Sequence, residues 1–210
     1  MIKVFIDQGH NPTHPNAGDE GSGLREQDLV YEIGIRLAEL LNSDPEFDAR
    51  LSRNSPSEIL GETTAQSLRA RTDAANSWGA DIFISLHANA SAISSASGNE
   101  GLVYKIPSAA YTLSEDILTE LSLATGLQNR GTNARPGLYV LRKTTMPAVL
   151  VELGFITNAG DAALMRNEPE LFARGIYEGI RRYYGLPTTV RGYIGRLAVA
   201  KHKSAENLMP

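Results

Sequence analysis

The stretch IFISLH, residues 82–87, is an apolar run that stops at a histidine. Two other runs have the same design: IKVFID (residues 2–7) is followed by His10, and Val149-Leu150-Val151 leads directly into Glu152. Short runs of β-branched and aliphatic residues, flanked by Gly, Pro and Asn, are typical of strands buried on both faces. In open α/β sheets, ligands bind beyond the carboxyl ends of the strands. We therefore expect an α/β fold in which side chains far apart in sequence share one site.

Strands and helices alternate along the rest of the chain. Further strands are predicted at residues 49–53, 101–106 and 138–141. Helical spacing of apolar residues predicts a helix that opens near Glu26. Three more helices are predicted from apolar faces made of Leu68, Ala75 and Trp78, of Leu113, Ile117, Leu118 and Leu121, and of Phe172, Ile176, Ile180 and Tyr183. This alternation is typical of α/β domains, and we expect residues 1–186 to form one.

The composition limits the kinds of partner and site. The 210 residues suffice for one domain, and 24 acidic against 20 basic side chains give a net charge of −4, which does not favour nucleic acid. The chain has no cysteine, so zinc would have to be held by His, Asp or Glu. The apolar start is too short for a secretory signal, and no run approaches the roughly 20 apolar residues of a membrane span. We therefore expect synthesis in the cytoplasm and no integral membrane segment.

The last part of the chain, residues 187–210, has a different composition. It carries four basic residues and one acidic residue, namely Arg191, Arg196, Lys201, Lys203 and Glu206. The segment is too short to build a core of its own. Two interpretations stay open: a loosely docked tail or linker, and an arm that contacts an anionic wall polymer, a partner domain or another subunit.

Two histidines and one carboxylate are candidates for a catalytic zinc site. Such sites commonly use three His or carboxylate ligands and keep a fourth position for water or substrate, and His10, Glu26 and His87 would supply that set. A carboxylate beside the ion, at Glu152, would move protons during the reaction. The residues Asp7, Asp19 and Glu20 are rivals for the carboxylate ligand, and Asp7 could instead orient His10.

Each of these residues also has an explanation that involves no metal. A histidine at a strand end is commonly a structural residue, and a helix dipole alone favours Glu26 in a first helical turn. Glu152 is harder to explain in this way, because a buried carboxylate is costly unless it is paired or protonated. His14, in a loop, and His202, near the end of the chain, are not assigned as ligands.

Four segments stand out together, in the order DQGH (residues 7–10), LREQDL (24–29), SLHANA (85–90) and PAVLVELGFITN (147–158). They resemble the zinc-dependent N-acetylmuramoyl-L-alanine amidases of the type called amidase 3. The resemblance covers about residues 2–186, which is almost the whole chain. The sequence departs from the family pattern at Gln8, where proline is usual, and at Asn11, where glycine is common, which bears on the shape of the loop beside His10.

The resemblance implies a twisted, mostly parallel, mixed sheet with helices on both faces. It implies one zinc ion bound by His10, Glu26 and His87, and Glu152 as the catalytic acid and base. The implied substrate is peptidoglycan, cleaved at the amide between N-acetylmuramic acid and the first L-alanine of the stem peptide. An autolysin or a phage or prophage endolysin would have this activity and would act on the wall after release or lysis.

Three further residues are candidates for substrate contacts. Arg69 and Arg71 could clamp carboxylates of the stem peptide, although exposed helix arginines are ordinarily just solvated. Asn89 could donate a hydrogen bond to substrate, although asparagine after a strand is commonly a turn residue. Two other functions stay open: a zinc peptidase that cuts within the stem peptide or its crosslink, and a wall-binding module without turnover.

Overall fold

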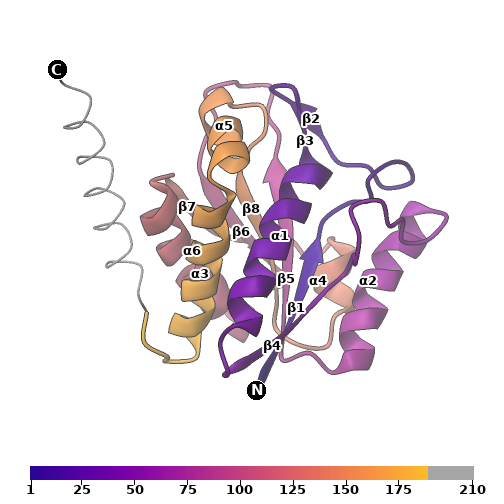
Figure 1. Ribbon diagram of the computed structural model, residues 1–210, viewed down its shortest axis with the longest axis vertical. Coiled ribbons are helices and arrows are strands. Elements are labelled where there is room, and N and C mark those ends of the chain that lie inside the picture. The colour runs from indigo at the N-terminus through magenta and orange to yellow at the C-terminus, as the bar shows by residue number, and fades with distance from the viewer. Residues whose placement is uncertain (189–210) are drawn as a thin grey trace.

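A six-stranded sheet forms the centre of the protein (Figure 1). The computed structural model describes residues 1–188. The strands of the sheet, in spatial order, are β4 (Phe47–Leu51), β1 (Ile2–Gln8), β5 (Ile82–Asn89), β8 (Ala148–Phe155), β6 (Asn99–Val103) and β7 (Asn129–Ala134). The first four are parallel, whereas β6 is antiparallel to β8 and parallel to β7. A mostly parallel, mixed sheet, as implied by the family resemblance, is confirmed.

Helices cover both faces of the sheet. The larger core packs α1 (Glu26–Asn42), α3 (Ala109–Thr125) and α6 (Pro169–Tyr183) against one face. The smaller core packs α2 (Thr64–Trp78) and α4 (Tyr139–Lys143) against the other, which lies to the right in Figure 1. The helix α5 (Ala159–Asn167) connects β8 to α6, and a two-stranded sheet of β2 (Glu20–Gly21) and β3 (Leu24–Arg25) precedes α1.

The alternation of side chains along the strands decides which face carries the site. In β5, Ile82, Ile84 and Leu86 lie in the larger core, whereas Phe83 lies in the smaller one. Successive side chains of a strand point to opposite faces. The side chain of His87 therefore lies on the same face as Phe83, which α2 and α4 cover. It comes after the last apolar residue of that face of β5.

Three predictions about individual elements were inaccurate. The strand predicted at residues 138–141 is wrong, because Tyr139–Lys143 forms helix α4, which buries Val140 and Leu141 against Leu150. A four-residue apolar run has the same composition in a buried strand and in a short helix, so periodicity does not separate them. The strand predicted at residues 49–53 is Phe47–Leu51 in the structure, and the strand predicted at residues 101–106 is Asn99–Val103.

Residues 189–210, which make up most of the tail predicted at 187–210, lie outside the described residues. The domain boundary at residue 186 therefore stays a prediction. Within residues 1–188, no helix combines the length and apolar character needed to cross a membrane.

Candidate active site

Three side chains from separate elements converge at the carboxyl ends of β1 and β5. His10 Nε2 lies 3.1 Å from Glu26 Oε2 and 3.1 Å from His87 Nδ1, and His87 Nδ1 lies 3.0 Å from Glu26 Oε1. All three ligand atoms lie within 4.8 Å of one another. Bonds of about 2 Å at the tetrahedral angle separate the ligand atoms of a zinc ion by about 3.3 Å. The spacing therefore fits one small divalent ion.

The charge of the cluster also suits a cation. Burial opposes ionisation of Glu26, but hydrogen bonds to His10 and His87 outweigh it and hold the pKa of Glu26 well below its usual range. Burial likewise disfavours a charged His87, yet the hydrogen bond and charge of Glu26 raise the pKa of His87. The carboxylate is thus held as an anion that needs positive charge beside it. A divalent ion can supply that charge in place of protons on the imidazoles.

The backbone fixes the Glu26 carboxylate from two sides. Glu26 is the first residue of α1, as expected from the sequence. The amide of Asp19 donates to Oε2 at 2.9 Å, and the amide of Ala88 donates to Oε1 at 2.9 Å. The Glu26 side chain is 3% exposed, whereas the two imidazoles are each about one-fifth exposed, at 20% for His10 and 19% for His87. Solvent and ligands therefore approach past the histidines.

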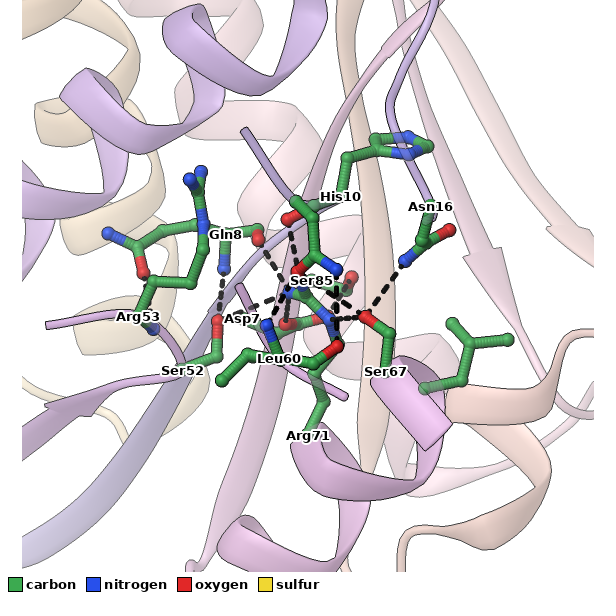
Figure 2. Close-up of polar contacts among 12 residues, drawn as sticks. Asp7, Gln8, His10, Asn16, Ser52, Arg53, Leu60, Ser67, Arg71 and Ser85 are labelled. Atoms are coloured by element: carbon green, nitrogen blue, oxygen red, sulfur yellow. Dashed lines mark hydrogen bonds and ion pairs between the residues drawn. The ribbon is translucent and has the colours of Figure 1, made fainter. Parts of the chain in front are cut away.

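A buried arginine holds the loop that carries His10. Figure 2 shows Arg71 among the polar side chains below this loop. Its guanidinium donates to the carbonyls of Gln8, at 2.6 Å, and His10, at 2.5 Å, and to Asp7 Oδ1 at 2.6 Å. It also donates to Asn11 Oδ1 at 3.2 Å. His10 itself has a φ of 65°, which is uncommon for a residue other than glycine, so its conformation depends on these contacts.

Glycine is required next to His10 because the strands approach closely there. A Cβ atom on Gly9 would lie 2.6 Å from Cε1 of His87 and 2.5 Å from the carbonyl oxygen of Leu86. Such distances force a neighbouring group to move. The absence of a side chain at Gly9 thus lets the His87 imidazole lie against β1, within reach of His10.

Glu152 lies beside the cluster, on the strand next to His87. The two residues are direct partners in the pairing of β5 with β8. Burial raises the pKa of Glu152 to about 7, and the charges of Glu26 and Glu100 add to this effect while His87 opposes it. Among the described residues, no hydrogen-bond partner reaches the buried atom Oε2 of Glu152. A carboxyl group in this state can exchange a proton near neutral pH.

An apolar cavity of about 140 Å³ opens beside the histidines. Its wall includes Leu68 of α2 and Leu138 and Tyr139 at the start of α4, together with His10 and His87. A larger groove of about 450 Å³ between α1 and α5 contains none of the four candidate residues. The smaller cavity is therefore the one that adjoins the polar cluster.

The three predicted substrate contacts have different surroundings. The Arg71 side chain is only 1% exposed, and its guanidinium nitrogens donate to the His10 loop, to Asp7 and to two serine side chains, so its observed contacts support the loop beside His10. Asp7 contacts Arg71 and Ser85, and it therefore acts on His10 through Arg71. Arg69 is 73% exposed and pairs with Asp73 on its own helix.

Asn89 lies at the end of β5, after an irregularity in the pairing between His87 and Asn89. Its Nδ2 donates to Glu100 Oε2 at 3.4 Å. Glu100, which sequence reasoning missed, comes one residue before the predicted strand at 101–106. Its pairing with Glu152 depends on the antiparallel direction of β6, which no local sequence pattern indicates.

Comparison with known proteins finds one family over most of the chain. A family model described as N-acetylmuramoyl-L-alanine amidase matches residues 4–182. The N-acetylmuramoyl-L-alanine amidase CwlM of Bacillus licheniformis is 36% identical over 190 residues, which cover 89% of this chain and 70% of that protein. The sporulation-specific N-acetylmuramoyl-L-alanine amidase of Bacillus subtilis is 32% identical over 211 residues, covering 99% and 78%.

The fold has counterparts among solved structures. The catalytic domain of CwlV, an N-acetylmuramoyl-L-alanine amidase from Bacillus (Paenibacillus) polymyxa, superposes with a TM-score of 0.78 at 29% identity. The match covers 89% of this chain and all of that domain. The described fold is therefore that of a catalytic domain of this kind.

Proposed function

This chain belongs to the N-acetylmuramoyl-L-alanine amidase family, and we propose that it uses a single zinc ion, held by His10, Glu26 and His87, to hydrolyse its substrate. The activity is that of a peptidoglycan hydrolase, which cleaves the amide between N-acetylmuramic acid and the L-alanine of the stem peptide. The observation that carries the zinc proposal is the convergence of three ligand atoms within 4.8 Å, next to a carboxyl group.

The ligand atoms are His10 Nε2, His87 Nδ1 and a carboxylate oxygen of Glu26. A bound zinc ion supplies Lewis acidity, which polarises a carbonyl and makes water more acidic. The backbone amides of Asp19 and Ala88 keep the Glu26 carboxylate oriented. Arg71 and Gly9 keep the His10 loop against β5, so that the two imidazoles face the same point.

Glu152 carries the proton in this proposal. In its ionised form, the carboxylate accepts a proton from the attacking water, and in its protonated form it donates that proton to the nitrogen of the departing alanine. Burial favours the neutral form and so brings both forms within reach near neutral pH. The carboxyl group of Glu152 must face substrate and not solvent. Its Oε2 atom agrees with this, since it is buried and has no hydrogen-bond partner among residues 1–188.

Product analysis of digested peptidoglycan tests the activity and the alternatives. The zinc-loaded protein is expected to expose amino groups that all belong to L-alanine and to leave glycan strands without peptide. New amino groups on other residues would show a peptidase and would overturn the proposal. Absence of any release by correctly folded, zinc-loaded protein would favour a wall-binding module instead.

Two histidine variants test the zinc ligands directly. His87→Ala is expected to lose bound zinc and activity, because the remaining two ligands hold the ion weakly. His14→Ala is the matched control, since His14 is exposed on a loop and lies outside the cluster. Equal zinc content in the two variants would contradict the assignment.

The site of action follows from the substrate. We propose that the protein acts on the cell wall after release from the cell or after lysis, as an autolysin or an endolysin does. Comparing lysis by protein added outside intact cells with lysis during expression inside them would test this route.

A further inference from the structure

A second carboxylate lies next to Glu152, on the side away from the proposed zinc ligands. His87 pairs with Glu152 between β5 and β8, and Glu152 pairs with Glu100 between β8 and β6. Side chains of directly paired residues lie on the same face of a sheet, and in an antiparallel pair such as Glu152 and Glu100 their Cβ atoms are about 4.5–5.5 Å apart. His87, Glu152 and Glu100 therefore form one row across three adjacent strands.

Two asparagines orient the Glu100 carboxylate. Asn133 Nδ2, on β7, donates to Oε1 at 2.8 Å, and Asn89 Nδ2, on β5, donates to Oε2 at 3.4 Å. Among the described residues, no Lys or Arg forms an ion pair with Glu100. Each carboxylate oxygen can accept more than one hydrogen bond. Glu100 is partly exposed, so it is a fixed negative charge with capacity for a cationic ligand.

The reaction creates such a cation at this end of the row. Water replaces the amide nitrogen on the acyl carbon, so the C–N bond breaks and a C–O bond forms. The products are a carboxylate on the glycan side and an α-amino group on the peptide, which takes up a proton and is an ammonium near neutral pH. The uncleaved amide carries no charge, so a carboxylate near the nitrogen distinguishes product from substrate.

The order of the side chains in the row indicates where the positive charge of the product forms. The acyl carbon must lie at the His10–Glu26–His87 end, where water is activated, and the nitrogen must reach Glu152 to receive its proton. Glu100 is the next side chain beyond Glu152. We propose that Glu100 binds the α-ammonium group of the released stem peptide and stabilises positive charge on the leaving nitrogen. This inference rests on the proposed amidase function.

The test compares two synthetic peptides that begin with L-alanine, one with a free α-amino group and one N-acetylated. Their dissociation constants are measured by calorimetry with the zinc-loaded protein. The wild-type protein is expected to prefer the free amine by about fivefold, the size of an ion pair near the surface. Glu100→Gln, which keeps the shape of the side chain, is expected to lose this preference.

Two more variants separate recognition from support of the sheet. Glu115→Gln removes a carboxylate that accepts from Thr132, beside β7 but outside the row, and is expected to keep the preference. Asn133→Ala frees one oxygen of Glu100 and is expected to reduce the preference only in part. A structural role alone would change unfolding temperature without changing the ratio between the two peptides.

The outcomes separate this inference from the proposed function. A wild-type protein that releases L-alanine termini from peptidoglycan but does not prefer the free amine overturns the role of Glu100 alone. The same conclusion follows if Glu100→Gln keeps the full preference. A protein that releases no L-alanine termini overturns the amidase function, whatever the peptides show.

Discussion

Replacing Arg71 by methionine is expected to destabilise the protein strongly. Arg71 and Asp7 form an ion pair at 2.6 Å, with side chains that are 1% and 2% exposed. Methionine is similar in length but has no charge and no donors. In the variant, Asp7 Oδ1 would lose its contact with the guanidinium, whereas Asp7 Oδ2 would keep the hydrogen bond from Ser85 at 2.7 Å.

The magnitude follows from the buried charge that is left behind. Removal of one partner from a buried ion pair typically costs about 3–5 kcal/mol. The carbonyls of Gln8 and His10 also lose their bonds to the guanidinium, which places the expected loss in the upper half of that range. A domain of this kind has a total stability of about 5–15 kcal/mol, so the change is a large fraction of it.

Urea unfolding of the zinc-free protein measures this loss. Arg69→Met is the matched control, because Arg69 lies on the same helix but is 73% exposed, and its pair with Asp73 contributes about 0–1 kcal/mol. The double variant Asp7→Asn/Arg71→Met is expected to lose less than the sum of the two single variants, since no unpaired charge is buried. A loss below about 1 kcal/mol in Arg71→Met, or a loss equal to that of Arg69→Met, would refute the reasoning.

Three other perturbations test separate parts of the structure. Glu152→Gln is expected to keep zinc and to lower turnover by about 10²–10⁴-fold, measured as L-alanine termini released per minute, and turnover within tenfold of the wild type would contradict the proton transfer. Gly9→Ala is expected to weaken zinc binding in a chelator competition, because its Cβ would lie 2.6 Å from His87. Gly137→Ala should not weaken it, because in the described part of the chain no atom would lie within 4 Å of the new Cβ. Burial raises the pKa of Asp44, but contacts with Glu46, Tyr177 and Arg181 lower it overall, so its contribution to stability is present above about pH 4 and lost as the pH falls further. The unfolding free energies of wild type and Asp44→Asn should therefore differ at pH 6 and converge near pH 2, and a difference independent of pH would contradict this assignment.

The strand ends were predictable because apolar runs and their bounding residues are local features. The runs before His10, His87 and Glu152 are all strands of the central sheet, and Glu26 does open a helix. Parallel strands bring their carboxyl ends to one edge, which is why the approach of these side chains could be expected before the structure was known.

The supporting contacts could not be predicted in the same way. Arg71 looks like a solvated helix residue in the sequence, since its burial depends on how α2 packs against β1, some 60 residues earlier in the chain. The strand β7, Asn129–Ala134, has too few apolar residues to show a strand pattern, because it lies at the edge of the sheet. The position of Glu100 beside Glu152 depends on the antiparallel pairing of β6 with β8, which is a property of the whole fold.

Anomalous X-ray diffraction at the zinc edge, from crystals of the zinc-loaded protein, tests the central claim most directly. The expected result is one strong peak within bonding distance of His10 Nε2, His87 Nδ1 and a carboxylate oxygen of Glu26, with Glu152 beside it but not bound. A peak elsewhere, or imidazoles that turn away from a common ion, would contradict the account.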